Sequence, residues 1–167
     1  MKVIHKFIAL LLLINLSACS DNTPDVQPPP LEATGTEKTD VVELQKLINL
    51  PITPTKVVWE INKVTEPSSK YDREDWSVVA RMELTEKDFK ILSNVPMPIK
   101  VIKFPKYAVE PWMEDIIATK FKPDDTGDFY TPRGTVLSAE QFYKDPLVTG
   151  AIYMISETEI LLYVQTE

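Results

Sequence analysis

Carboxylates are the main candidates for chemistry in this chain, because its only histidine and its only cysteine lie at one end. The only histidine, His5, and the only cysteine, Cys19, fall within the first 19 of 167 residues. The chain after Cys19 therefore has no serine–histidine or cysteine–histidine nucleophile pair, and no histidine-ligated metal site. Its four glycines are isolated from one another, which excludes a glycine-rich phosphate loop.

One acidic triplet matches a catalytic motif. Asp125-Thr126-Gly127 has the sequence of the aspartic protease triplet. Those enzymes place two such carboxylates on a shared proton, so they need a second copy. Here a polar segment precedes the triplet, where the proteases have an apolar strand, and the chain contains no second copy. We therefore do not expect a protease.

Two further uses of the 25 acidic residues have to be weighed. Asp124, Asp125 and Asp128 could ligate calcium together with backbone oxygens, but their spacing does not match an EF-hand loop. A solvated acidic loop is the favoured interpretation, and we expect no metal and no cofactor. A glycan hydrolase needs only two acids on a cleft, and the sequence singles out no pair.

Aromatic residues and an arginine favour a binding surface. Phe129, Tyr130 and Arg133 fall in a segment flanked by acids, and Trp112 follows a Glu-Pro pair. Tyrosine, tryptophan and arginine are typical anchors of protein interfaces. The alternative is that the three aromatic residues only cover the core, and for these residues we favour that alternative.

The N-terminus has the layout of an export signal. The first six residues carry two lysines and no acid, and residues 7–16 form an apolar run. That run is too short for a membrane-spanning helix, which needs about 20 residues. It ends in Leu16-Ser17-Ala18-Cys19, where small residues precede the only thiol of the chain.

These four residues resemble the lipobox of bacterial lipoproteins at every position. The resemblance implies cleavage before Cys19 and attachment of the protein to a membrane through lipid on that cysteine. It also implies sorting to the outer membrane, facing the periplasm, because Ser20 stands where an aspartate would favour retention in the inner membrane. The domain itself resembles no family.

Composition divides the chain into a signal peptide (1–18), a lipidated and proline-rich tether (19–40) and a domain (41–167). The tether has too few apolar residues to offset the entropy of ordering it. Without the two signal lysines the chain has 16 basic and 25 acidic residues, a net charge of −9. This balance argues against a nucleic-acid partner, which needs clustered basic residues.

Within the domain, apolar spacing predicts strands that more often follow one another along the chain than alternate with helices. Residues 41–48 have helical spacing, whereas residues 56–64 and 75–84 alternate as strands, the second of them half-buried. Residues 150–156 and 160–165 are apolar on both faces and predict a central hairpin. Capping patterns at Thr85 and Ser138 predict that a helix begins at each, and Pro111 suits the first position of a further helix. Residues 99–104 suit an edge strand. Residues 122–134 are predicted to form a long loop.

We therefore expect an α+β domain with a mostly antiparallel sheet of four to five strands and about four short helices. The expected function is that of a non-catalytic module that binds a protein partner in the envelope. An inhibitor or immunity protein for a periplasmic toxin or hydrolase is the form to test first. The alternatives are a carboxylate-dependent hydrolase of envelope glycans and an assembly accessory lipoprotein.

Overall fold

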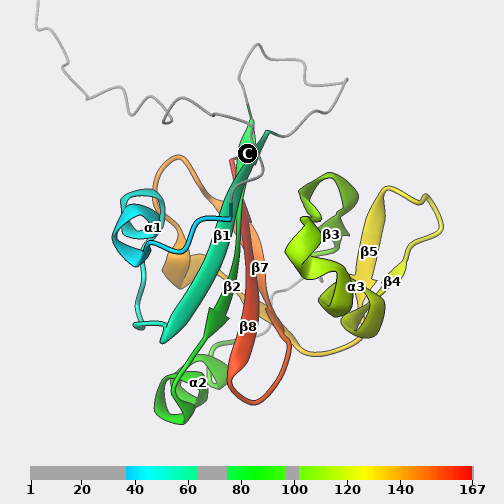
Figure 1. Ribbon diagram of the computed structural model, residues 1–167. Helices are drawn as coiled ribbons and strands as arrows, with labels where there is room; N and C mark the ends of the chain where they lie inside the picture. Colours follow the sequence, from blue (N-terminus) through cyan, green and yellow to red (C-terminus); the bar gives the residue numbers. More distant parts are fainter. Residues whose placement is uncertain (1–36, 64–74, 97–101, 167) are drawn as a thin grey trace, which may run out of the picture. The chain divides into compact units, whose positions relative to one another are not determined.

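A five-stranded antiparallel sheet organises the domain in the computed structural model, which describes residues 37–63, 75–96 and 102–166. Its strand order is β1-β2-β8-β7-β6 (Figure 1). The strands span Lys56–Lys63 (β1), Trp76–Glu83 (β2), Val136–Ser138 (β6), Thr149–Met154 (β7) and Glu159–Gln165 (β8). The predicted α+β class and antiparallel sheet are confirmed.

β7 and β8 form the predicted apolar hairpin. Every residue from Ile160 to Val164 is buried, because β8 lies in the middle of the sheet and both of its faces are covered. The strand predicted at residues 56–64 is β1. Trp59 and Trp76, which the alternation assigns to the core, are 2% and 3% exposed.

α1 (Val41–Leu47) lies on one side of this sheet (Figure 1). Asp40 caps the helix, since its carboxylate accepts hydrogen bonds from the first-turn amides, at 2.7 Å for Val42. The Trp59 indole N–H donates to the carbonyl oxygen of Asp40 at 3.1 Å, which fixes the start of the helix against β1. Leu44 is then fully buried on the inner side of α1.

The ordered domain begins before Val41. Lys38 exchanges two backbone hydrogen bonds with Trp59, and its ammonium group lies 5.0 Å from the centre of the indole ring. Residues 38–40, which composition assigns to the tether, thus pair with the outer edge of β1. Cys19 and most of the tether lie outside the described residues.

Two predicted caps have different outcomes. Thr85 caps α2 (Glu86–Ser93) by accepting a hydrogen bond from the amide of Asp88 at 3.1 Å. Ser138 accepts one from the amide of Glu140, but only a single 3₁₀ turn follows, η3 (Glu140–Phe142). Phe142 is fully buried and Tyr143 returns to an extended conformation, so packing ends the helix after one turn.

A second layer, built by residues 102–132, covers the other face of the sheet. It contains a three-stranded sheet in the order β3-β5-β4, two 3₁₀ turns and one α-helix (Figure 1). These elements span Phe104–Pro105 (β3), Lys106–Ala108 (η1), Pro111–Met113 (η2), Glu114–Lys120 (α3), Phe121–Pro123 (β4) and Phe129–Pro132 (β5). The helix predicted after Pro111 is therefore a 3₁₀ turn that continues into α3.

The prediction of a long loop over residues 122–134 is wrong. The segment is a hairpin in which β4 pairs with β5, and β5 also pairs with β3. Both strands are short and each ends in a proline, Pro123 in β4 and Pro132 in β5, so neither shows an alternating apolar pattern in the sequence. Of the edge strand predicted at residues 99–104, only its last residues are described, and β3 is observed at Phe104–Pro105.

The second layer also corrects the prediction that β2 is half-buried. Ser77 and Val79, which alternation places on the solvent side, are both 0% exposed. Val79 belongs to a hydrophobic cluster that joins the two layers. The rings of Phe104, Phe121, Tyr153 and Tyr163 fill its middle, with centroids 5.2–5.7 Å apart in tilted and edge-on pairs.

Phe104→Ala tests the importance of this cluster. We expect the free energy of unfolding to fall by about 3–4 kcal/mol, because the substitution leaves a cavity between the layers. Urea denaturation followed by circular dichroism measures this loss. Phe129→Ala, which truncates a half-buried ring, is the matched control and should cost about 1 kcal/mol or less. Equal losses in the two variants would contradict a core centred on Phe104.

Candidate functional site

A row of polar side chains lies on the face of the five-stranded sheet that the second layer covers. The register sets Asn62 opposite Ser77 and Ser77 opposite Gln165, while Glu60 and Tyr163 flank Val79 in the next row. Glu60 is only 8% exposed and Ser77 is 0% exposed. Buried polar groups need partners, so the elements above them determine what these residues can do.

η2 supplies the partner of Glu60. Pro111 occupies the first position of this turn and Trp112 follows it. The Trp112 indole N–H donates to Oε1 of Glu60 at 3.0 Å, and the ring packs against the hydrophobic cluster. Trp112, predicted to contact a partner, is thus half-buried and joins the second layer to β1.

Glu110 brings a second carboxyl group to Glu60. Burial, followed by the charge of Glu60 and a hydrogen bond with it, raises the pKa of Glu110 to about 7. The Asn62 amide opposes this rise, but its Nδ2 atom has no partner with regular hydrogen-bond geometry. Near neutral pH Glu110 is therefore protonated for part of the time.

Tyrosines extend the polar row beneath η1. The hydroxyls of Tyr107 and Tyr163 lie 2.8 Å apart, and both contact Oε1 of Gln165. Burial raises the pKa of Tyr163 well above its usual range, so its phenol stays neutral. The polar row, defined by these residues with Glu60, Asn62, Ser77, Glu110 and Trp112, thus ties η1 and η2 to the sheet.

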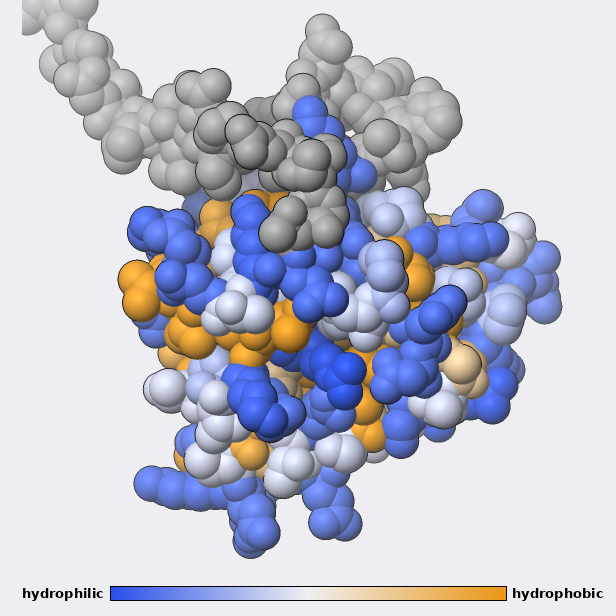
Figure 2. All heavy atoms as spheres, viewed as in Figure 1, coloured by the Kyte–Doolittle hydropathy of each residue, from blue (hydrophilic) through white to orange (hydrophobic). Residues whose placement is uncertain are grey.

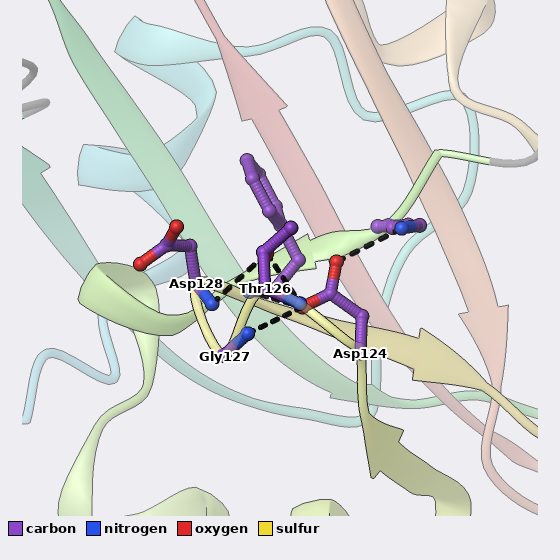
Figure 3. Close-up of polar contacts among 6 residues, drawn as sticks. Asp124, Thr126, Gly127 and Asp128 are labelled. Carbon is purple, nitrogen blue, oxygen red and sulfur yellow. Dashed lines mark hydrogen bonds and ion pairs between the residues drawn. The ribbon is translucent and has the colours of Figure 1, made fainter.

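The turn between β4 and β5 is organised by Asp124 (Figure 3). Its Oδ1 accepts hydrogen bonds from the amides of Thr126, Gly127 and Phe129 and from the Thr126 hydroxyl, at 2.8–3.4 Å. Lys103 pairs with the other oxygen at 2.9 Å, and this contact is the main reason why the pKa of Asp124 lies below its usual range. Gly127 has φ +80°, a conformation that favours glycine.

The candidate calcium ligands do not converge. The Asp128 carboxylate points away from that of Asp124, and Asp125 is exposed (Figure 3). Within residues 37–63, 75–96 and 102–166, no three or more acidic, histidine or cysteine residues are placed to hold a metal ion. Asp125-Thr126-Gly127, the protease-like triplet, forms the tight turn of the hairpin.

The other predicted contact residues separate on β5. Tyr130 pairs with Phe104 and packs against the hydrophobic cluster, so it covers the core. Phe129 and Thr131 alternate to the opposite face of the small sheet. Arg133 is exposed just beyond the strand. Phe129 thus begins β5 whereas Arg133 follows its last residue, and Trp112 belongs to the polar row.

Sequence reasoning missed the Glu60–Glu110 pair. Glu60 falls on the polar side of an alternating strand, where a solvated glutamate is ordinary. Glu110 precedes a proline and a tryptophan, the one local signal that its surroundings might be apolar. Fifty residues separate the two, and nothing in the sequence links them.

The chain matches no protein-family model, and comparisons with curated proteins and with solved structures find no significant match. Among the helices of the described residues, none is long and apolar enough to cross a membrane.

Glu110 predicts a pH dependence of stability. Its pKa is about 7 in the folded protein, against an ordinary value of 4.5, so the folded state holds more protons between these two values. The free energy of unfolding should therefore fall as pH rises from about 4.5 to 7. We expect a loss of roughly 1–2 kcal/mol from this group, because solvent screens a half-exposed carboxyl.

Urea denaturation at pH 5 and pH 8.5 checks this expectation. Glu110→Gln should flatten the pH profile and be the more stable protein at pH 8.5. Glu114→Gln, an exposed glutamate at the start of α3, is the matched control and should keep the parental slope. A parental slope in Glu110→Gln would show that another group causes the dependence.

Asp124→Ala tests the organisation of the turn. Removing the carboxylate takes away the acceptor of the Thr126 and Phe129 amides, so their hydrogen exchange should accelerate by about tenfold or more. Asp124→Asn keeps an acceptor oxygen and loses only the charge that pairs with Lys103, and should retain part of the protection. Unchanged exchange in the alanine variant would contradict the assigned role.

Proposed function

We propose that this protein is a lipid-anchored, non-catalytic binding module of the bacterial cell envelope. The anchor rests on the lipobox at Leu16-Ser17-Ala18-Cys19. The observation that carries the non-catalytic part is that the described polar clusters serve the fold. Asp124 holds a turn, and the polar row attaches the second layer to the sheet. Recognition by exposed side chains is then the simplest use of the domain.

The partner we propose is a protein, and the form to test first is a toxin or hydrolase that reaches the periplasm. An inhibitor or immunity protein needs a small domain held at the membrane where its target acts. The net charge of −9 after signal removal suits a basic target, because opposite charges accelerate encounter. An assembly accessory lipoprotein would share these properties, and identifying the partner separates the two.

The outer face of the small sheet is the contact surface we propose. Phe129 and Thr131 lie on it together with Lys122, the residue opposite Thr131 on β4, and Arg133 follows. This face therefore offers a half-buried aromatic ring and, just beyond the other end of β5, an exposed arginine, a residue type enriched among interface anchors. On the face drawn in Figure 2, hydrophobic residues lie in several patches divided by polar ones, which offers less to an apolar partner.

A pull-down with the domain carrying Cys19→Ser tests this surface. The immobilised protein should recover one stoichiometric partner from envelope extracts. Phe129→Ala combined with Arg133→Glu should reduce the recovery about tenfold or more, since loss of one anchor typically costs at least 1–2 kcal/mol.

Lys56→Glu changes an exposed charge on the far edge of the large sheet and is the matched control. It should recover as much partner as the parent. Recovery of background proteins alone by the parent would contradict the binding proposal. Equal recovery by the surface variant would contradict only the choice of surface.

One observation favours the alternative of a carboxylate-dependent glycan hydrolase. The Glu60–Glu110 pair includes a group with a raised pKa, as a general acid requires. Glycosidase carboxyls, however, lie about 5–9.5 Å apart to admit the sugar or a water molecule. Glu60 is only 8% exposed and its Oε1 already accepts the hydrogen bond of the Trp112 indole, which does not suit a carboxyl that must face a sugar in a cleft. Release of products from purified peptidoglycan that Glu110→Gln abolishes would establish the alternative.

A further inference from the structure

Three cations lie together at the open end of the β4–β5 hairpin, the end away from its turn. Lys122 on β4 is opposite Thr131 on β5. The Arg133 amide donates to the Lys120 carbonyl at 2.8 Å, which sets these two residues side by side directly beyond the ladder. Lys122 and Arg133 are exposed, and Lys120 is half-buried. We call Lys120, Lys122 and Arg133 the cationic patch.

The cationic patch has no neutralising carboxylate in the described part of the chain. None of the ion pairs within residues 37–63, 75–96 and 102–166 involves its three members. The two segments that build it, residues 116–123 and 129–139, contain no acidic residue at all. Asp124, which follows β4, already pairs with Lys103 at 2.9 Å. In a strongly acidic chain, the patch is therefore a local excess of positive charge.

We propose that the cationic patch docks a carboxylate-bearing segment of the protein partner. This inference rests on the proposed function, because it assigns a chemistry to the partner of the surface chosen there. An arginine can hold a carboxylate through two parallel hydrogen bonds, and a lysine adds a point charge. Arg133 and Lys122 can do so without first breaking an ion pair within the domain. Phe129, half-buried at the other end of β5, offers the same segment an apolar contact.

The hairpin turn favours a protein segment over an anionic membrane as the occupant. Asp125 and Asp128 are exposed in that turn, at the opposite end of the hairpin from the cationic patch. A flat anionic surface that reaches the patch also brings its charge towards these aspartates. The net charge of −9 after signal removal opposes the approach of the whole domain to such a surface. A protein segment can present its carboxylates to the patch alone.

The two signs of charge together orient the docked partner. The net negative charge attracts a partner that is basic overall, as proposed above. The cationic patch repels the basic parts of that partner and attracts the part that carries carboxylates. The acidic segment of the partner therefore meets the patch, while its basic surface faces the acidic remainder of this domain.

An NMR titration of residues 19–167 carrying Cys19→Ser tests the site. The probe is a short synthetic peptide of glutamates around a single phenylalanine, and its control has lysine in place of every glutamate. The acidic peptide should shift the amide signals of Lys122, Thr131 and Arg133. Its affinity should fall about threefold or more when NaCl is raised from about 20 to about 200 mM, because salt screens exposed charges. The lysine peptide should leave these signals unchanged.

Charge reversal provides the matched pair of variants. Lys122→Glu combined with Arg133→Glu should weaken binding of the acidic peptide about tenfold or more, because it replaces both exposed cations of the patch with like charges. Lys87→Glu combined with Lys90→Glu changes the net charge by the same amount at exposed positions on α2. This control should weaken binding by less than about threefold, since distant charges are screened.

Unchanged signals at Lys122, Thr131 and Arg133, or equal losses of affinity in the two variants, would overturn the inference. Vesicles of phosphatidylglycerol that shift these amides when the acidic peptide does not would also overturn it and assign the patch to the membrane. If the reversed variant does not fold, the salt dependence and the lysine peptide decide the result in the parent. The titration needs no envelope extract, so its failure leaves the pull-down result standing, and an empty pull-down contradicts the proposed function without removing the peptide site.

Discussion

Burial of the second face of the large sheet is the constraint on which the rest of the structure depends. One face of β2 and β8 is apolar enough to be read as core, but the other carries Ser77, Arg81 and Tyr163 among its apolar residues. Residues 102–132 cover this mixed face with the rings of Phe104 and Phe121. Without that layer, the apolar side chains of both partners would face water.

The same burial is the main cause of the raised pKa of Glu110. A glutamate on the outer side of an antiparallel strand ordinarily stays solvated and acidic. Here the cover brings η2 down onto Glu60, removes water and places Glu110 beside it. Desolvation then acts together with like charge, and both raise the pKa of Glu110. The layer that covers the sheet thus also raises the proton affinity of Glu110.

The two layers also divide the polar side chains between structural tasks. One carboxylate oxygen of Asp124 accepts the hydrogen bonds that close the turn, and the other oxygen pairs with Lys103. The polar row fixes η1 and η2. The Arg133 side chain, by contrast, is exposed. This division of the polar side chains is what supports the proposal of a binding module.

The sequence by itself determined the elements with strong local signals. Alternation located β1, β2 and the β7–β8 hairpin, helical spacing located α1, and the capping pattern at Thr85 located α2, because each signal arises within about ten residues. It also supplied the resemblance of residues 16–19 to a lipobox, on which the proposed location rests. Short strands bounded by proline gave no periodic signal, so the small sheet was read as a loop.

Only the tertiary structure decided what lies on the second face of β2 and β8. Glu60 and Glu110 are 50 residues apart, and they become neighbours because residues 102–132 fold back onto the sheet. The same folding made Trp112, a candidate anchor, a half-buried hydrogen-bond donor to Glu60, and it left Phe129 on the outer face. Local spacing records which side of an element a residue occupies. It does not indicate which other elements cover that side, and those elements determine how buried the residue is and how far its pKa shifts.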